Sequence, residues 1–264
     1  MLQGVATRGT TPARGLDPGL LVRLLGRPPF IGAIVLNLVG FALHITALQS
    51  LPLFLVQCVI SGSVAVTALL SVRVFGVPLT RGQQAAVIAV FAGLVMLGPT
   101  AKSGTAVHVS SSAPVLLLAV VVGLVVLATG AARLPPVAGA SILGLLAGAS
   151  FGVVAVSARL LPDLTPSALV GAPGVYVLAA AAVVAFLLYS MAMQRGSVTT
   201  STAAVVVTQT TVPALVGAAF LGDEVRSGLF PLAVAGFLLA LLGALGLARF
   251  EASATPADQP VEQR

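Results

Sequence analysis

The chain has 264 residues, of which 58% are hydrophobic and only 8% are charged. Soluble domains carry roughly 25% charged residues, so this chain has too little charge to cover a soluble fold. Its apolar runs repeatedly reach about 18 residues, the length that crosses a bilayer. The net charge of +6 comes from basic residues that stand singly between those runs. This spacing is typical of orientation signals and argues against a nucleic-acid-binding surface.

An all-α membrane protein of about eight transmembrane helices is therefore predicted. Residues 1–29 are expected to be a cytoplasmic N-terminal segment, since no apolar core follows the arginines at the distance that a signal peptide requires. The transmembrane domain covers 30–249, and the polar tail 250–264 is predicted to be disordered. The expected spans are 30–50, 53–74, 84–99, 113–132, 137–159, 172–193, 199–221 and 229–249. Cys58 is the only cysteine, so no intrachain disulfide can form.

The basic residues predict the orientation of these spans. With eight spans, both termini lie on one side of the membrane, and ten arginines fall on that side against three basic residues on the other. The ten are Arg8, Arg14, Arg23, Arg27, Arg73, Arg81, Arg133, Arg195, Arg249 and Arg264, and the three are Lys102, Arg159 and Arg226. Positive charge accumulates on the cytoplasmic side. Both termini of this multi-pass protein are therefore predicted to be cytoplasmic, in the cell membrane.

A weak internal repeat relates the two halves of the chain. At an offset of 145 residues the identities are Phe41/Phe186, Ala47/Ala192, Gln49/Gln194, Phe75/Phe220 and Arg81/Arg226. The span 30–50 enters from the cytoplasm, whereas its counterpart 172–193 enters from outside. The halves are therefore predicted to be inverted repeats, a build in which the substrate site lies near the midplane between the repeats.

Several motifs resemble the drug/metabolite transporter superfamily (EamA-like), in particular its nine-span branch that includes the NIPA-like magnesium transporters. They are ALQSLPLFLVQ at 47–57, YSMAMQRGSVTTSTAAVVVTQTTVPALVGAAFLGDEV at 189–225, AVFAGLVMLG at 89–98 and AVAGFLLALLG at 233–243. The likeness covers roughly residues 30–250. Gly222-Asp223-Glu224 matches the family's signature before the last helix, while Gly76-Val77-Pro78 in the first half lacks the acid.

The resemblance also implies a further helix at the start of the fold. Members of the family begin with a helix before the span 30–50, and residues 1–8 look like the end of such a helix. We therefore expect the coding start to lie upstream. The resemblance implies a secondary transporter of a small solute.

The candidate lining of a central cavity consists of polar side chains within the spans, together with one proline. His44 shares a helical face with Asn37, and Gln57 and Ser61 are one turn apart. Tyr189 is the later counterpart of His44. Thr202, Gln209 and Pro213 form one stripe, in which Pro213 frees the Gln209 carbonyl. The alternative use of these polar groups is hydrogen bonding between helices.

Three glycines one turn apart predict a close helix contact, and they are Gly144, Gly148 and Gly152. Packing within the chain is the expected use, and a homodimer interface is the alternative.

The familiar signatures of catalysis and cofactor binding are absent from the sequence. No Walker-type loop, catalytic Ser-His-acid set or metal-ligand spacing occurs, so we expect neither an enzyme nor a cofactor. The spans also lack a carboxylate, which disfavours a hard cation such as Mg²⁺. We expect a transporter of a small metabolite, amine or drug-like solute. The alternatives are a NIPA-like magnesium or divalent cation transporter and a non-transporting assembly or lipid-binding subunit.

Overall fold

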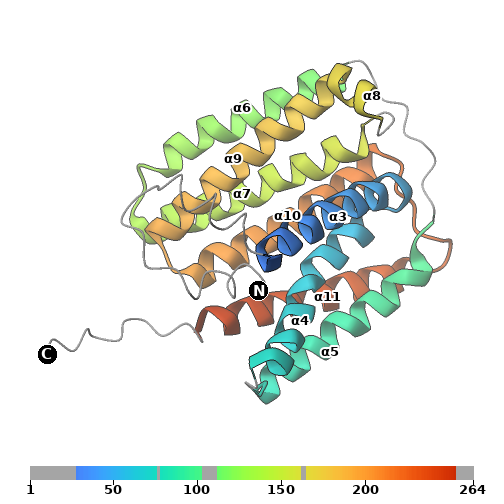
Figure 1. Ribbon diagram of the computed structural model, residues 1–264, viewed down its shortest axis with the longest axis vertical. Helices are drawn as coiled ribbons and strands as arrows, with labels where there is room; N and C mark the ends of the chain where they lie inside the picture. Colours follow the sequence, from blue (N-terminus) through green and yellow to red (C-terminus); the bar gives the residue numbers. More distant parts are fainter. Residues whose placement is uncertain (1–27, 76–77, 103–111, 162–164, 254–264) are drawn as a thin grey trace, which may run out of the picture. The chain divides into compact units, whose positions relative to one another are not determined.

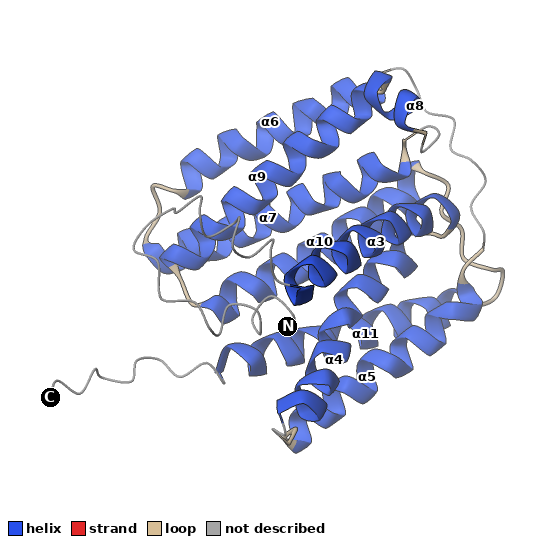
Figure 2. Cartoon of the chain, viewed as in Figure 1, coloured by secondary structure: helices blue, strands red, loops and turns tan. Residues whose placement is uncertain are grey.

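The computed structural model describes residues 28–75, 78–102, 112–161 and 165–253 of the chain (Figure 1). These residues form helices and no strand (Figure 2). The helices are α3 (Pro28–Ser50), α4 (Leu53–Phe75), α5 (Arg81–Leu97), the 3₁₀ helix η1 (Gly98–Thr100), α6 (Ala113–Ala131), α7 (Pro136–Arg159), α8 (Pro166–Gly171), α9 (Pro173–Arg195), α10 (Val198–Phe220) and α11 (Phe230–Ser253). The chain divides into two units, Met1–Ala47 and Leu48–Arg264.

Seven stretches of the described residues are long and apolar enough to cross a membrane. They are Leu53–Val74, Arg81–Thr100, Ala113–Ala131, Pro136–Arg159, Pro173–Arg195, Thr199–Phe220 and Phe230–Arg249. The prediction of a multi-span helical membrane protein is thereby confirmed. The expected first span, 30–50, coincides with α3, which is not among the seven, so its crossing of the membrane stays a prediction.

The two expected terminal segments differ from the structure where they can be compared. The helix α11 continues to Ser253, past the expected start of the tail at residue 250. The rest of the tail, and residues 1–27 of the N-terminal segment, lie outside the described residues. The short helix α8 occupies a stretch where only a linker was expected.

Proline and hydroxyl residues set where several helices begin. Proline stands in the first turn of several helices, where the missing N–H is not needed, for example Pro114 in α6, Pro136 in α7, Pro166 in α8 and Pro173 in α9. The start of α5 carries a capping box. The Thr80 side chain accepts the Gln83 backbone N–H at 3.3 Å, and the Gln83 side chain accepts the Thr80 N–H at 2.9 Å.

The unit 48–264 is a bundle in which neighbouring helices come from distant parts of the sequence. The helix α7 packs on α9 and α10, α5 packs on α11, and α4 contacts both α10 and α11. The helix α6 packs on α7 and α9, and these three lie side by side in Figure 1. On α6, Val115 is 70% exposed and Val126 is 62% exposed. Such a large apolar surface suits contact with lipid rather than with water.

Glycine allows α5 and α11 to approach backbone to backbone. A Cβ atom added at Gly93 would lie 2.6 Å from the Gly236 carbonyl oxygen and 2.5 Å from the Ala240 nitrogen. A Cβ added at Gly236 would lie 2.9 Å from the Gly93 oxygen. Because lipid removes the hydrophobic driving force between helices, such close van der Waals contact is a main source of their association.

Replacing Gly93 by alanine should lower the thermal unfolding midpoint in detergent, because the new methyl group meets backbone atoms of α11 that cannot turn aside. Overpacking of this kind costs about 1–3 kcal/mol. The matched control is Gly123→Ala in α6, where an added Cβ meets nothing within 4 Å. Equal midpoints for Gly93→Ala and Gly123→Ala would contradict this account of the α5–α11 contact.

Candidate functional site

The turn between α3 and α4 leaves backbone groups without helical partners. Pro52 has no N–H, so the Leu48 carbonyl, four residues earlier, has no helical donor. At the start of α4 the first N–H groups have no intrahelical acceptor. Leu48 and Leu53 are fully buried, so water does not satisfy these groups. Partners from other helices are required.

Asp223 supplies the acceptor for the start of α4. Its Oδ2 atom accepts the Leu53 backbone N–H at 2.6 Å, and its side chain is fully buried. Two glycines place it there. Gly222 has φ 67°, a left-handed conformation that turns the chain after α10, and the Asp223 N–H then donates to the Gly217 carbonyl at 3.0 Å. A Cβ at Gly217 would collide with the Asp223 carboxylate.

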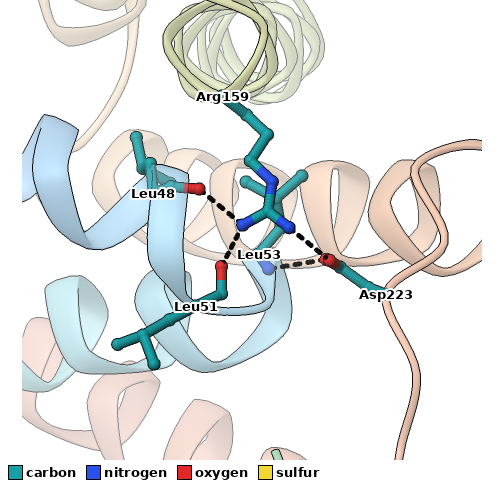
Figure 3. Close-up of polar contacts among 5 residues, drawn as sticks. All are labelled: Leu48, Leu51, Leu53, Arg159 and Asp223. Atoms are coloured by element: carbon teal, nitrogen blue, oxygen red, sulfur yellow. Dashed lines mark hydrogen bonds and ion pairs between the residues drawn. The ribbon is translucent and has the colours of Figure 1, made fainter. Parts of the chain in front are cut away.

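Arg159 supplies the donors for the end of α3. It is the last residue of α7, and its side chain is 2% exposed. Its Nη1 atom donates to the Leu48 carbonyl at 2.5 Å and also to the Leu51 carbonyl, while Nη2 pairs with Asp223 Oδ1 at 3.2 Å. Figure 3 shows this network, which we call the end clasp: Leu48, Leu51, Leu53, Arg159 and Asp223.

The charges of the end clasp match the helix ends that they touch. The carbonyls at the end of α3 carry partial negative charge and face Arg159, and the first N–H of α4 carries partial positive charge and faces Asp223. Burial raises the pKa of the Asp223 carboxyl group, and the Leu53 N–H and the Arg159 charge oppose that rise. Each ion is thus held by the other and by backbone groups, as a buried pair requires.

A second set of contacts, which includes an exposed ion pair, joins the loop after α10 to the segment that follows α5. Lys102 Nζ lies 2.5 Å from Glu224 Oε2, and the two side chains are 60% and 64% exposed. The hydrogen bond and charge of Lys102 lower the pKa of Glu224. The Arg226 N–H also donates to the buried Thr100 carbonyl at 3.0 Å. The loop 221–229 therefore links the ends of α4, α5 and α7.

Among the predicted lining residues, Ser61 of α4 contacts α10. Its hydroxyl lies 2.5 Å from the Thr210 hydroxyl, and both side chains are buried. Because the Thr210 hydroxyl donates to the Val206 carbonyl at 2.7 Å, Ser61 is the donor to Thr210. Gln57, one turn before Ser61, is 5% exposed. The α4–α10 contact is thus partly polar.

Tyr189 and Thr202 are also brought together. The Tyr189 hydroxyl at the end of α9 lies 2.9 Å from the Thr202 hydroxyl near the start of α10. Sequence reasoning named each residue but did not pair them.

The remaining candidates of α10 lie against the glycines of α7. A Cβ added at Gly148 would lie 3.0 Å from the Gln209 nitrogen, and one added at Gly152 would lie 3.2 Å from Pro213 Cδ. Gly144 lies in the same way against Ser201, 3.0 Å from its carbonyl oxygen. Pro213 is fully buried, whereas Gln209 is half-buried. The three glycines thus face a helix of the same chain.

The two candidates on α3 belong to the other unit, Met1–Ala47. His44 is half-buried, and the side chain of Asn37 lies outside the described residues. In the described part of the chain, no group of three His, Cys, Asp or Glu side chains could hold a metal ion.

Sequence reasoning did not find the end clasp. The sequence identifies Arg159 only as one of three basic residues on the outer side, and Asp223 only as part of the motif Gly222-Asp223-Glu224. The pair is separated by 64 residues, and nothing local in the sequence joins them. The available signals were Gly222-Asp223, which favours a turn that presents the acid, and Pro52, which leaves a carbonyl in need of a donor.

Replacing Asp223 by alanine should destabilise the protein strongly, because Arg159 then stays buried without its counter-ion. Breaking a buried pair on one side costs about 3–5 kcal/mol. The measurement is the thermal unfolding midpoint in detergent. The matched control is Glu224→Ala, which removes the neighbouring carboxylate of the exposed pair and should leave the midpoint nearly unchanged. Similar losses in the two variants would argue against a buried pair.

No protein-family model, curated protein or solved structure matches this chain. The resemblance to the drug/metabolite transporter superfamily therefore rests on the sequence motifs and stays a proposal.

Proposed function

We propose that this protein is a secondary transporter that moves a small polar solute across the membrane by alternating access between two inverted halves. The observation that carries the proposal is the matching of two helix pairs. The helix α9 begins and ends 145 residues after α3, and α10 begins and ends 145 residues after α4. This is the offset that the sequence identities predict. Four candidate spans lie between α4 and α10, so these two helices cross the membrane in opposite directions if each span crosses once.

Contacts between α4 and α10 support a two-fold relation of the halves. Ser61 contacts Thr210, and Ala65 and Val206 lie in one core cluster. Residue numbers rise along α4 as they fall along α10, so the helices cross antiparallel. The offset of 145 carries Ser61 onto Val206 and Ala65 onto Thr210. Each pair is thus the image of the other, as an axis through this crossing requires.

The chemistry of the interior favours a polar organic solute over a bare ion. The polar side chains between α4, α9 and α10 are hydroxyls and amides, which are neutral donors and acceptors. Asp223 and Glu224 lie beyond the end of α10, outside the spans. A hard divalent cation prefers carboxylate ligands, so amines, amino acids and nucleosides fit this interior better than Mg²⁺.

The end clasp is proposed to close the transporter at one end. It ties the α3–α4 turn to the ends of α7 and α10, and alternating access requires such a closure to open once in each cycle. At the offset of 145, the counterpart of Asp223 is Pro78, which has no charge. The closure is therefore one-sided, which favours a resting state that is shut at the clasp end.

Transport should be detectable by counterflow in proteoliposomes loaded in turn with amino acids, nucleosides, amines and Mg²⁺. For the transported solute, Gln209→Ala and His44→Ala should each lower uptake roughly fivefold, because loss of one polar contact costs about 1 kcal/mol. Gln84→Ala is the control, since Gln84 is exposed and bonds to its own helix start. Folded protein with no counterflow for any solute would favour a non-transporting assembly or lipid-binding role. Counterflow of Mg²⁺ alone would favour the divalent cation transporter.

Opening of the clasp should expose Cys58, the only cysteine. Cys58 is 1% exposed and lies five residues into α4, about 7 Å along the helix from its start. Asp223→Asn should increase the rate at which a membrane-impermeant methanethiosulfonate reagent labels it, because the start of α4 loses a charged acceptor. Glu224→Gln should label at the wild-type rate. Equal rates in all three proteins would count against the clasp as a closure.

A further inference from the structure

A groove runs between α6 and α9 near the ends of both helices. It has a volume of about 460 Å³. Its apolar wall is formed by Val125, Ala128, Val184, Leu187, Leu188 and Met191. Thr129 also lines it, but the Thr129 hydroxyl donates to the Val126 carbonyl at 2.6 Å. The wall therefore offers no free donor to a polar ligand, and an apolar chain suits it.

Positive charge marks one end of this groove. Arg133 lines the groove two residues after α6 ends, and its side chain is exposed. Arg195 ends α9, one turn beyond Met191, and its Nη1 atom is buried without a hydrogen-bond partner. A Cβ added at Gly139 would lie 3.1 Å from that nitrogen and 2.9 Å from the Ala131 carbonyl oxygen. The Arg195 guanidinium therefore lies beside the end of α6.

No acid balances these two guanidinium groups in the described part of the chain. The pairs Arg159–Asp223 and Lys102–Glu224 lie at the opposite ends of the helices. A buried guanidinium nitrogen without a partner is costly. The exposed Arg133 can take an anion as its counter-ion at this end of the groove, and the buried Arg195 charge close by adds to the attraction.

We propose that this groove binds one anionic glycerophospholipid, with an acyl chain between α6 and α9 and the phosphate at Arg133. From Val125 to Arg133 the groove follows eight residues, about 12 Å of helix, which accommodates the upper half of an acyl chain. Guanidinium groups bind phosphate by paired, charge-assisted hydrogen bonds. Basic pockets between spanning helices recognise anionic headgroups in this way. The site does not depend on whether the protein transports a solute.

Native mass spectrometry of the full chain in detergent, with equal amounts of dioleoyl-phosphatidylglycerol and dioleoyl-phosphatidylcholine, tests the site. Wild-type protein should retain roughly ten times more phosphatidylglycerol than phosphatidylcholine, which is the effect of one charge-assisted contact. Arg133→Gln should bring the two lipids close to parity. The control Arg81→Gln, which removes an exposed arginine at the start of α5, should keep the preference. Thr129→Trp, which fills the groove, should reduce retention of both lipids.

Three results would overturn the proposal. One is equal retention of the two lipids by the wild-type protein. Another is an Arg133→Gln variant that keeps the wild-type preference, and the third is an Arg81→Gln variant that loses it as fully as Arg133→Gln does. A Thr129→Trp variant that is folded and retains both lipids as before would move the binding surface away from the groove. Thermal unfolding midpoints of the variants check that each one is folded.

Discussion

A buried arginine and a buried aspartate hold one end of this bundle together. In an apolar environment either ion alone is costly, and the pair is tolerated because backbone groups complete its hydrogen bonding. Those backbone groups are the ones that a tight turn between two helices leaves unsatisfied. Pro52 removes one N–H, which leaves the Leu48 carbonyl without a helical donor, and Arg159 donates to that carbonyl instead. The unsatisfied backbone groups of the turn and the two buried ions thus complete each other's hydrogen bonding.

The helix contacts in the unit 48–264 are of two kinds. Glycine brings α5 onto α11 and α7 onto α10, with added Cβ positions as close as 2.6 Å to opposing backbone oxygens. Such contacts are dense and cannot slide without losing most of their van der Waals energy. The contact of α4 with α10 instead includes the Ser61–Thr210 hydroxyl pair, whose hydrogen bond water or a polar solute can replace. If the halves move against each other, the polar contact is the one that can open at least cost.

Much of the architecture could be predicted from the sequence because it depends on local properties. Runs of apolar residues fix the spans, and the spacing of Gly144, Gly148 and Gly152 fixes a narrow face along α7. The rest depends on which faces meet, and no local property decides that. The side-chain partners of Thr202 and Ser61 come from helices whose rotation is set by packing. The Arg159–Asp223 pair is still less accessible to sequence reasoning, since both residues read as ordinary charges at helix ends.

The two ends of the bundle solve the problem of charge in different ways. At the clasp end, Arg159 and Lys102 are each paired with a carboxylate of the chain. At the ends of α6 and α9, Arg133 and Arg195 have no acid beside them among the described residues, and one guanidinium nitrogen is buried without an acceptor. Unbalanced positive charge at a helix end attracts the anionic surface of a membrane. Ions that are paired within the chain need no counter-ion from lipid headgroups, whereas an unpaired arginine favours contact with an anionic headgroup. Any movement of the halves would therefore open the clasp end more readily than the arginine end.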